Sequence, residues 1–133
     1  MTQQAGLGQG NVEDGAMSIF EFGNGLIAQT HDAFTTRYAS TGLEIYGTHG
    51  SLIGTDVMTQ EPIGEVILKT ESGSETLPVE RFNLYEVGLN AFGEAIAGRG
   101  APAASGADGL RSLAASMAAV ESSRTGRKVE IAL

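Results

Sequence analysis

Two adjacent side chains with acid–base capacity, His31 and Asp32, stand near the end of a stretch with strand-like composition. Neighbouring residues on a strand point to opposite faces of a sheet, so these two cannot form a hydrogen-bonded catalytic pair. Either one can instead face a substrate at the edge of a sheet. Arg37 and Tyr38 follow in the next connection, where a guanidinium and a phenol suit a hydroxyl or a carboxylate. We single out His31, Asp32, Arg37 and Tyr38 as candidate substrate contacts; the alternative is a polar strand end with a solvated loop.

Other site chemistries find little support in the sequence. There are no cysteines, which excludes disulfides, thiolate metal ligands and a cysteine nucleophile. His31 and His49 are far apart and lack a matching cluster of acids, so no metal site is expected. Glycines at 6, 8 and 10 give G-x-G-x-G, whereas the dinucleotide-binding fingerprint needs G-x-G-x-x-G between a strand and a helix. We therefore predict that residues 1–12 are a flexible leader and that the glycine run does not bind a phosphate.

Composition narrows the class of protein. A length of 133 residues suits one domain, which we place at residues 13–133. The net charge of −8 disfavours nucleic-acid binding, because an acidic surface repels phosphates. No apolar run approaches the roughly 18 residues of a membrane span, and the polar N-terminus does not look like a secretory signal. The lack of cysteine suits a reducing compartment, so we expect a cytoplasmic protein.

Hairpin patterns fill the first part of the chain, and helical patterns follow. Apolar runs separated by Gly- and Asn-containing turns predict strands at 16–22, 26–34, 43–46, 51–55, 65–70 and 75–79. Asn83, with Glu86 three residues later, predicts the start of a helix that ends near Gly98. Ser105 and Asp108 predict a second helix, which Gly126 would end, and residues 129–132 suit a last strand.

Strands grouped before helices indicate an α+β fold. We expect a mostly antiparallel sheet of about six or seven strands with two helices packed on one face. The first strand has apolar residues on both sides, since Phe20 and Phe22 alternate with Met17 and Ile19. The second face of the sheet is therefore expected to meet a second subunit or another domain, and we expect oligomerisation as a dimer or tetramer.

Four segments, in order, resemble the C-terminal domain of the Gfo/Idh/MocA oxidoreductases, the family of glucose–fructose oxidoreductase and inositol dehydrogenase. They are Phe22–Ala28 (FGNGLIA), Leu43–Leu52 (LEIYGTHGSL), Asn90–Ile96 (NAFGEAI), and the closing series Pro102, Ser105-Gly106, Gly109-Leu110 and Gly126–Val129. No single segment is specific, but their order and spacing are. The resemblance covers about residues 13–133.

This resemblance implies a substrate-binding and oligomerisation domain of an NAD- or NADP-dependent oxidoreductase. A separate N-terminal Rossmann domain would bind the cofactor, and hydride transfer would act on a sugar, cyclitol or cyclic diol. The family's Glu-Lys-Pro motif and its catalytic helix are not found in this sequence. We therefore carry over no catalytic residue, and expect this chain alone to be inactive and to bind no cofactor.

Two other functions remain open. The chain can be a free-standing small-molecule-binding or assembly module with the same fold. It can also be a small independent enzyme that uses His31 or Asp32 in acid–base catalysis, which would require a closed pocket with a perturbed histidine.

Overall fold

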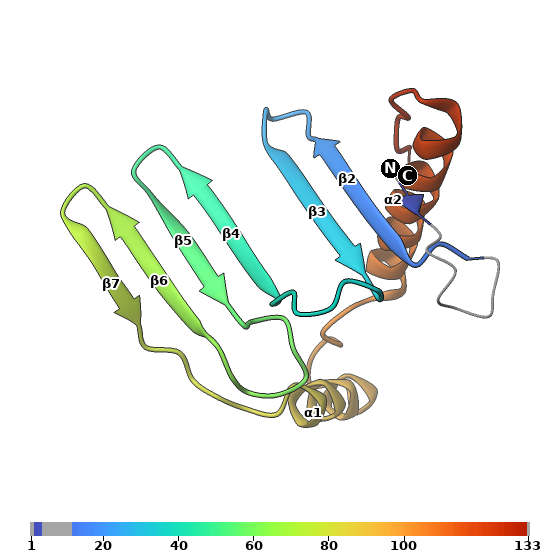
Figure 1. The fold of residues 1–133 in the computed structure, drawn as a ribbon. Helices are drawn as coiled ribbons and strands as arrows, with labels where there is room; N and C mark the ends of the chain where they lie inside the picture. Colours follow the sequence, from blue (N-terminus) through green and yellow to red (C-terminus); the bar gives the residue numbers. More distant parts are fainter. Residues whose placement is uncertain (1, 4–11, 133) are drawn as a thin grey trace. The chain divides into compact units, whose positions relative to one another are not determined.

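The computed structural model describes residues 2–3 and 12–132, and its ribbon is drawn in Figure 1. The chain divides into two compact units: Met1–Arg37 together with Ala104–Leu133, and Tyr38–Ala103. The glycine run at 6–10, and most of the predicted leader, lie outside the described residues.

The first unit contains a small antiparallel sheet of three strands in the order β1-β2-β3. β1 is Thr2–Gln3, β2 is Gly15–Glu21 and β3 is Ile27–Ala33. The turn between β2 and β3 forms as its Asn-Gly pair predicts. Leu26 donates its backbone N–H to Asn24 Oδ1 at 3.1 Å. Gly25 has φ of 86°, a conformation that glycine adopts without strain.

The pairing of β2 with β3 places apolar side chains on both faces of this sheet, as expected. Met17 and Ile19 share one face and are 49% and 71% exposed. Phe20 lies on the other face, directly opposite Ala28. Both side chains on the first face are therefore exposed to solvent.

The second helix, α2, spans Gly106–Thr125 and has the predicted ends. Ser105 and Asp108 form a reciprocal capping box at its start. Gly126 has φ of 66° and donates its N–H to Ser122 O at 2.8 Å, which ends the helix in a left-handed turn.

The predicted last strand at 129–132 is wrong, because residues 127–132 have no regular secondary structure. The segment runs along α2 instead. Val129 and Ile131 line a shared groove with Met117 of the helix, and the ammonium of Lys128 pairs with the carboxylate of Glu21 in β2. The apolar side chains of the segment thus face a helix, so they need no neighbouring strand.

The second unit contains a four-stranded antiparallel meander in the order β4-β5-β6-β7. β4 is Gly42–Gly47, β5 is Gly50–Thr55, β6 is Glu65–Thr70 and β7 is Gly73–Leu77. The strands therefore form two sheets, and the single sheet expected from the sequence is wrong. The break falls in the connection 34–41, which leaves the extended conformation at Tyr38, where φ is 64°.

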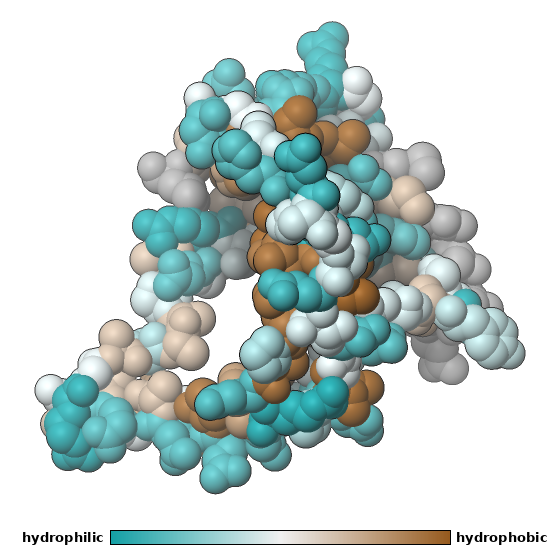
Figure 2. Space-filling view, turned by 90° about the vertical axis from the view of Figure 1, so that its left-hand side faces the viewer, coloured by the Kyte–Doolittle hydropathy of each residue, from teal (hydrophilic) through white to brown (hydrophobic). Residues whose placement is uncertain are grey.

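One face of the β4–β7 sheet is apolar. The register puts the following side chains on that face: Leu43, Ile45, Leu52, Val66, Leu68 and Leu77. Leu43 and Ile45 are more than half exposed, and Figure 2 shows hydrophobic side chains open to solvent on the side that it draws. We call these six residues the apolar face.

Helix α1, Leu84–Ile96, follows this sheet and begins at the predicted cap. Asn83 Oδ1 accepts the N–H groups of Tyr85 and Glu86 at 3.0 and 3.3 Å. No residue of either helix is buried among the described residues. Within this part of the chain, neither helix is long and apolar enough to cross a membrane.

Candidate functional site

The first two candidate residues lie on β3, where the sequence places them. His31 is paired with Met17 and Asp32 with Ala16, so the two side chains point to opposite faces of the sheet. Both are exposed. The two side chains are oriented as expected for neighbours on a strand, and at most one of them can face any ligand bound on a given side of this sheet.

The other two candidates, Arg37 and Tyr38, are exposed residues of the next connection. The division between the two compact units falls between them. Tyr38 is fully solvent-exposed, at 101%, and has φ of 64°. A bulky side chain rarely adopts this left-handed conformation, and such outliers are common at functional sites.

Two further left-handed residues lie in the connection between β5 and β6. Asp56 has φ of 53° and Met58 has φ of 64°. In an antiparallel meander, alternate connections meet at the same end of the sheet. The residues that precede β4, the 56–64 connection and the 78–83 segment therefore share one end of the β4–β7 sheet (Figure 1). Tyr38, Asp56 and Met58 all belong to that end.

The connection 56–64, which we call the β5–β6 loop, is tied to its neighbours by polar side chains. The guanidinium of Arg81 donates to Pro62 O at 2.9 Å and to Gly64 O at 3.0 Å. On the other side, Thr41 Oγ1 donates to Val57 O. Asp56 in turn donates its N–H to Thr41 O at 2.8 Å.

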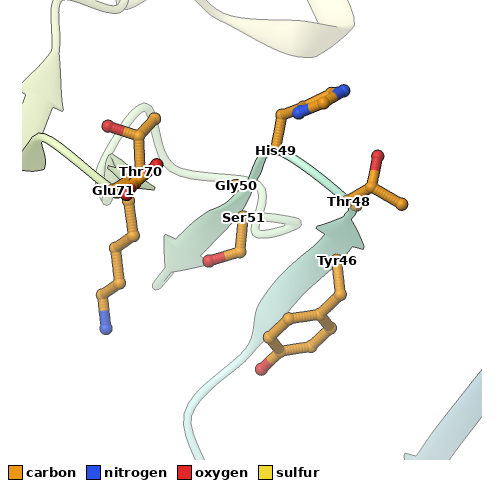
Figure 3. A pocket seen from close by; sticks show the side chains of 9 residues that line it. Tyr46, Thr48, His49, Gly50, Ser51, Thr70 and Glu71 are labelled. Carbon is orange, nitrogen blue, oxygen red and sulfur yellow. The ribbon is translucent and has the colours of Figure 1, made fainter.

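A shallow polar depression lies at the opposite end of the same sheet. It has a volume of about 440 Å³ and is lined by the β4–β5 hairpin and the end of β6, namely Tyr46–Ser51 and Lys69–Glu71. The side chains of Tyr46 and Ser51 extend to the same side, whereas His49 points away from them (Figure 3). The register extends this row to Lys69, which is directly opposite Ser51.

The pKa of Tyr46, in this depression, is raised. Its hydroxyl donates to Glu44 Oε2 at 2.6 Å, and this hydrogen bond to a carboxylate raises the pKa of the phenol above its ordinary value. Tyr46 therefore stays protonated at neutral pH. The depression offers hydroxyls, one imidazole, one ammonium and one carboxylate, which suit hydrogen bonding to a polar ligand.

No group of three or more acids and histidines that could hold a metal ion occurs in the described residues. Sequence reasoning overlooked Arg81 and Lys69. The partners of Arg81 are backbone carbonyls, which carry no residue-type signature. Lys69 reaches the depression only because β6 pairs with β5, and the residues of the connection 56–64 do not by themselves predict this pairing.

Comparison with known proteins identifies the family. Residues 1–131 match the model of the C-terminal alpha/beta domain of the oxidoreductase family Gfo/Idh/MocA. This chain belongs to the Gfo/Idh/MocA oxidoreductases. It is also 50% identical over 131 residues to the 1,5-anhydro-D-fructose reductase of Ensifer adhaerens.

The resemblance read from the four sequence segments is thereby confirmed. The match to the reductase covers 98% of this chain and 39% of the reductase. As a Gfo/Idh/MocA C-terminal domain, the chain corresponds to a minor part of that relative's length.

Proposed function

We propose that this chain is the substrate-binding domain of a reductase or dehydrogenase that transfers hydride between NAD(P)H and a sugar, a cyclitol or a cyclic diol. The match to the Gfo/Idh/MocA C-terminal domain over residues 1–131 carries the proposal. The 50% identity to a reductase of an anhydro sugar supports a cyclic polyhydroxy substrate. Hydride transfer needs the nicotinamide held against the substrate, so a separate dinucleotide-binding domain is part of the proposal.

In this proposal either His31 or Asp32 contacts the substrate, together with Arg37 and Tyr38. The support is their exposure and the left-handed backbone of Tyr38. An imidazole, a carboxylate, a guanidinium and a phenol all form hydrogen bonds with hydroxyl groups, which is the chemistry that recognition of a polyol needs. We propose no catalytic role for any of them.

We also propose that each helix packs on one face of the sheet in its own unit and that the domain self-associates. Exposed apolar surface supports this, both on the apolar face and at Met17 and Ile19 of β2. Contiguous apolar patches of this kind mark interaction sites in soluble proteins. The cytoplasmic location expected from the sequence stays a prediction.

A chimera tests the proposed function. Residues 1–131 of this chain would replace the matching part of the Ensifer adhaerens reductase. We expect the chimera to reduce 1,5-anhydro-D-fructose with NADH or NADPH, because half of the residues in the exchanged part are identical. The isolated 133-residue chain is expected neither to catalyse the reaction nor to bind NADH or NADPH in calorimetry.

Two outcomes would contradict the proposal. A folded chimera that binds the nicotinamide but never reduces a polyhydroxy ketone would show that this chain does not supply a substrate site. Reductase activity of the isolated chain would show instead that it is an enzyme in its own right.

A further inference from the structure

The non-glycine residues with positive φ are concentrated at one place in the fold. Among the described residues they are Tyr38, Asp56 and Met58, and all three belong to connections at the same end of the β4–β7 sheet. Such a backbone costs free energy in a residue with a side chain, and persists only when its surroundings fix it. The contacts that fix this end are therefore informative.

Arg81 fixes the last residues of the β5–β6 loop. Its two terminal nitrogens bind two carbonyls of one loop, Pro62 O and Gly64 O, at 2.9 and 3.0 Å. The planar guanidinium donates in a rigid fork, so it sets the spacing and direction of both carbonyls together. Hydrogen bonds from a charged donor are stronger than neutral ones.

The first residues of the loop are fixed by packing. Val57 lies over the buried Gly54, where a Cβ would come within 2.9 Å of Val57 Cγ2. At the end of the loop, Gly64 has φ of 95°, and a Cβ there would lie 2.6 Å from Thr55 O and Asp56 O. Asp56 and Met58 are held between these points, and the side chain of Met58 is 76% exposed.

We propose that Arg81 is a positioning residue that holds the β5–β6 loop as a preformed contact for the polyhydroxy substrate. This inference rests on the proposed function. The exposed side chains of Asp56, Gln60 and Glu61 supply carboxylate and amide groups for the hydroxyls of a ring. A fixed loop binds such a ligand without first losing conformational freedom.

The test compares three single variants of the active chimera. Arg81→Gln removes the charged fork, Arg81→Lys keeps the charge without the fork, and Arg99→Gln is the control. Arg99 belongs to the same unit and also makes two bonds, at 2.6 and 2.7 Å, but both go to the Glu94 side chain. We expect Arg81→Gln to raise KM for the sugar on the order of tenfold while kcat stays nearly constant. The KM of Arg81→Lys should lie between those of Arg81→Gln and the unaltered chimera, and the KM of Arg99→Gln should equal that of the unaltered chimera.

Amide hydrogen exchange in the 133-residue chain provides the structural readout. Arg81→Gln should speed exchange of the amides in the β5–β6 loop and leave those of β6 and β7 unchanged. A purely structural role would instead lower the fraction of folded enzyme, and so lower apparent kcat without changing KM. A lower apparent kcat with unchanged KM would overturn the inference. So would an exchange rate in the loop amides that is the same with and without Arg81→Gln. An unaltered chimera without activity would contradict the proposed function itself.

Discussion

Ser105 and Asp108 bind each other in both directions across the first turn of α2. The backbone N–H of Ser105 donates to Asp108 Oδ2 at 2.9 Å, and the N–H of Asp108 donates to Ser105 Oγ at 3.2 Å. The Ser105 hydroxyl also donates to Asp108 Oδ2, at 2.6 Å. These bonds, first that from the hydroxyl, hold the pKa of Asp108 below its ordinary value of 3.8.

A depressed carboxyl pKa predicts a direction for stability against pH. The ionised Asp108 stabilises the folded state above its unfolded pKa, and this contribution is lost as pH falls through the lower folded pKa. We expect Asp108→Asn to be less stable than the parent chain near pH 7, with the difference in stability narrowing as the pH falls through the lowered pKa of folded Asp108. Urea unfolding followed by circular dichroism at a series of pH values measures this difference. A difference that is constant with pH would mean that the charge of Asp108 does not stabilise α2.

Local chemistry made the turns and helix ends predictable. Asn24-Gly25 forms the expected turn, and Asn83, Ser105 and Gly126 cap helices as their types indicate. In each case the bonds join residues within a few positions of each other, so a short stretch of sequence contains both partners.

Long-range pairing was not predictable in the same way. The division into two sheets depends on whether β3 and β4 share hydrogen bonds, and no residue type reports that. Residues 129–132 have strand-like composition, yet Val129 and Ile131 lie along α2. The guanidinium of Arg81 donates to carbonyls 17 and 19 residues earlier in the chain, and a backbone carbonyl has no sequence signature.

Glycine at position 64 is required by space as well as by conformation. Gly64→Ala would place a Cβ 2.6 Å from the carbonyl oxygens of Thr55 and Asp56, at φ of 95°. Gly73→Ala is the matched control, because Gly73 also has positive φ, at 133°, but a Cβ there would meet nothing within 4 Å. The control should cost on the order of 1–3 kcal/mol for its backbone, and Gly64→Ala roughly 2 kcal/mol more for the overlap. Equal losses in urea unfolding would contradict the close approach at Gly64.

The opposite orientation of His31 and Asp32 makes their substitutions informative about substrate contact. In the active chimera we expect His31→Ala to raise KM for the sugar roughly tenfold with little change in kcat, because a lost hydrogen bond to bound substrate weakens binding. Gln29→Ala is the control, since Gln29 is exposed on the same face of β3. If Asp32→Ala raised KM and His31→Ala did not, the other face of this sheet would be the one that meets substrate.

The apolar face of the β4–β7 sheet predicts self-association that a single charge should abolish. Adjacent residues on β4 point to opposite faces, and Ile45 lies on the apolar face, 54% exposed, whereas Tyr46 lies on the other, 71% exposed. Burying a lysine ammonium without a partner is strongly unfavourable, so Ile45→Lys should prevent association and Tyr46→Lys should not.

Light scattering at several concentrations measures this directly. We expect the parent chain and Tyr46→Lys to have a mass of at least twice 13.8 kDa, and Ile45→Lys to remain at the monomer mass. A folded parent chain that stays monomeric at high concentration would show that a different surface, such as the cofactor-binding domain of the proposed enzyme, covers the apolar face. Association that survives Ile45→Lys would move the contact to the other exposed apolar surface, at Met17 and Ile19 of β2.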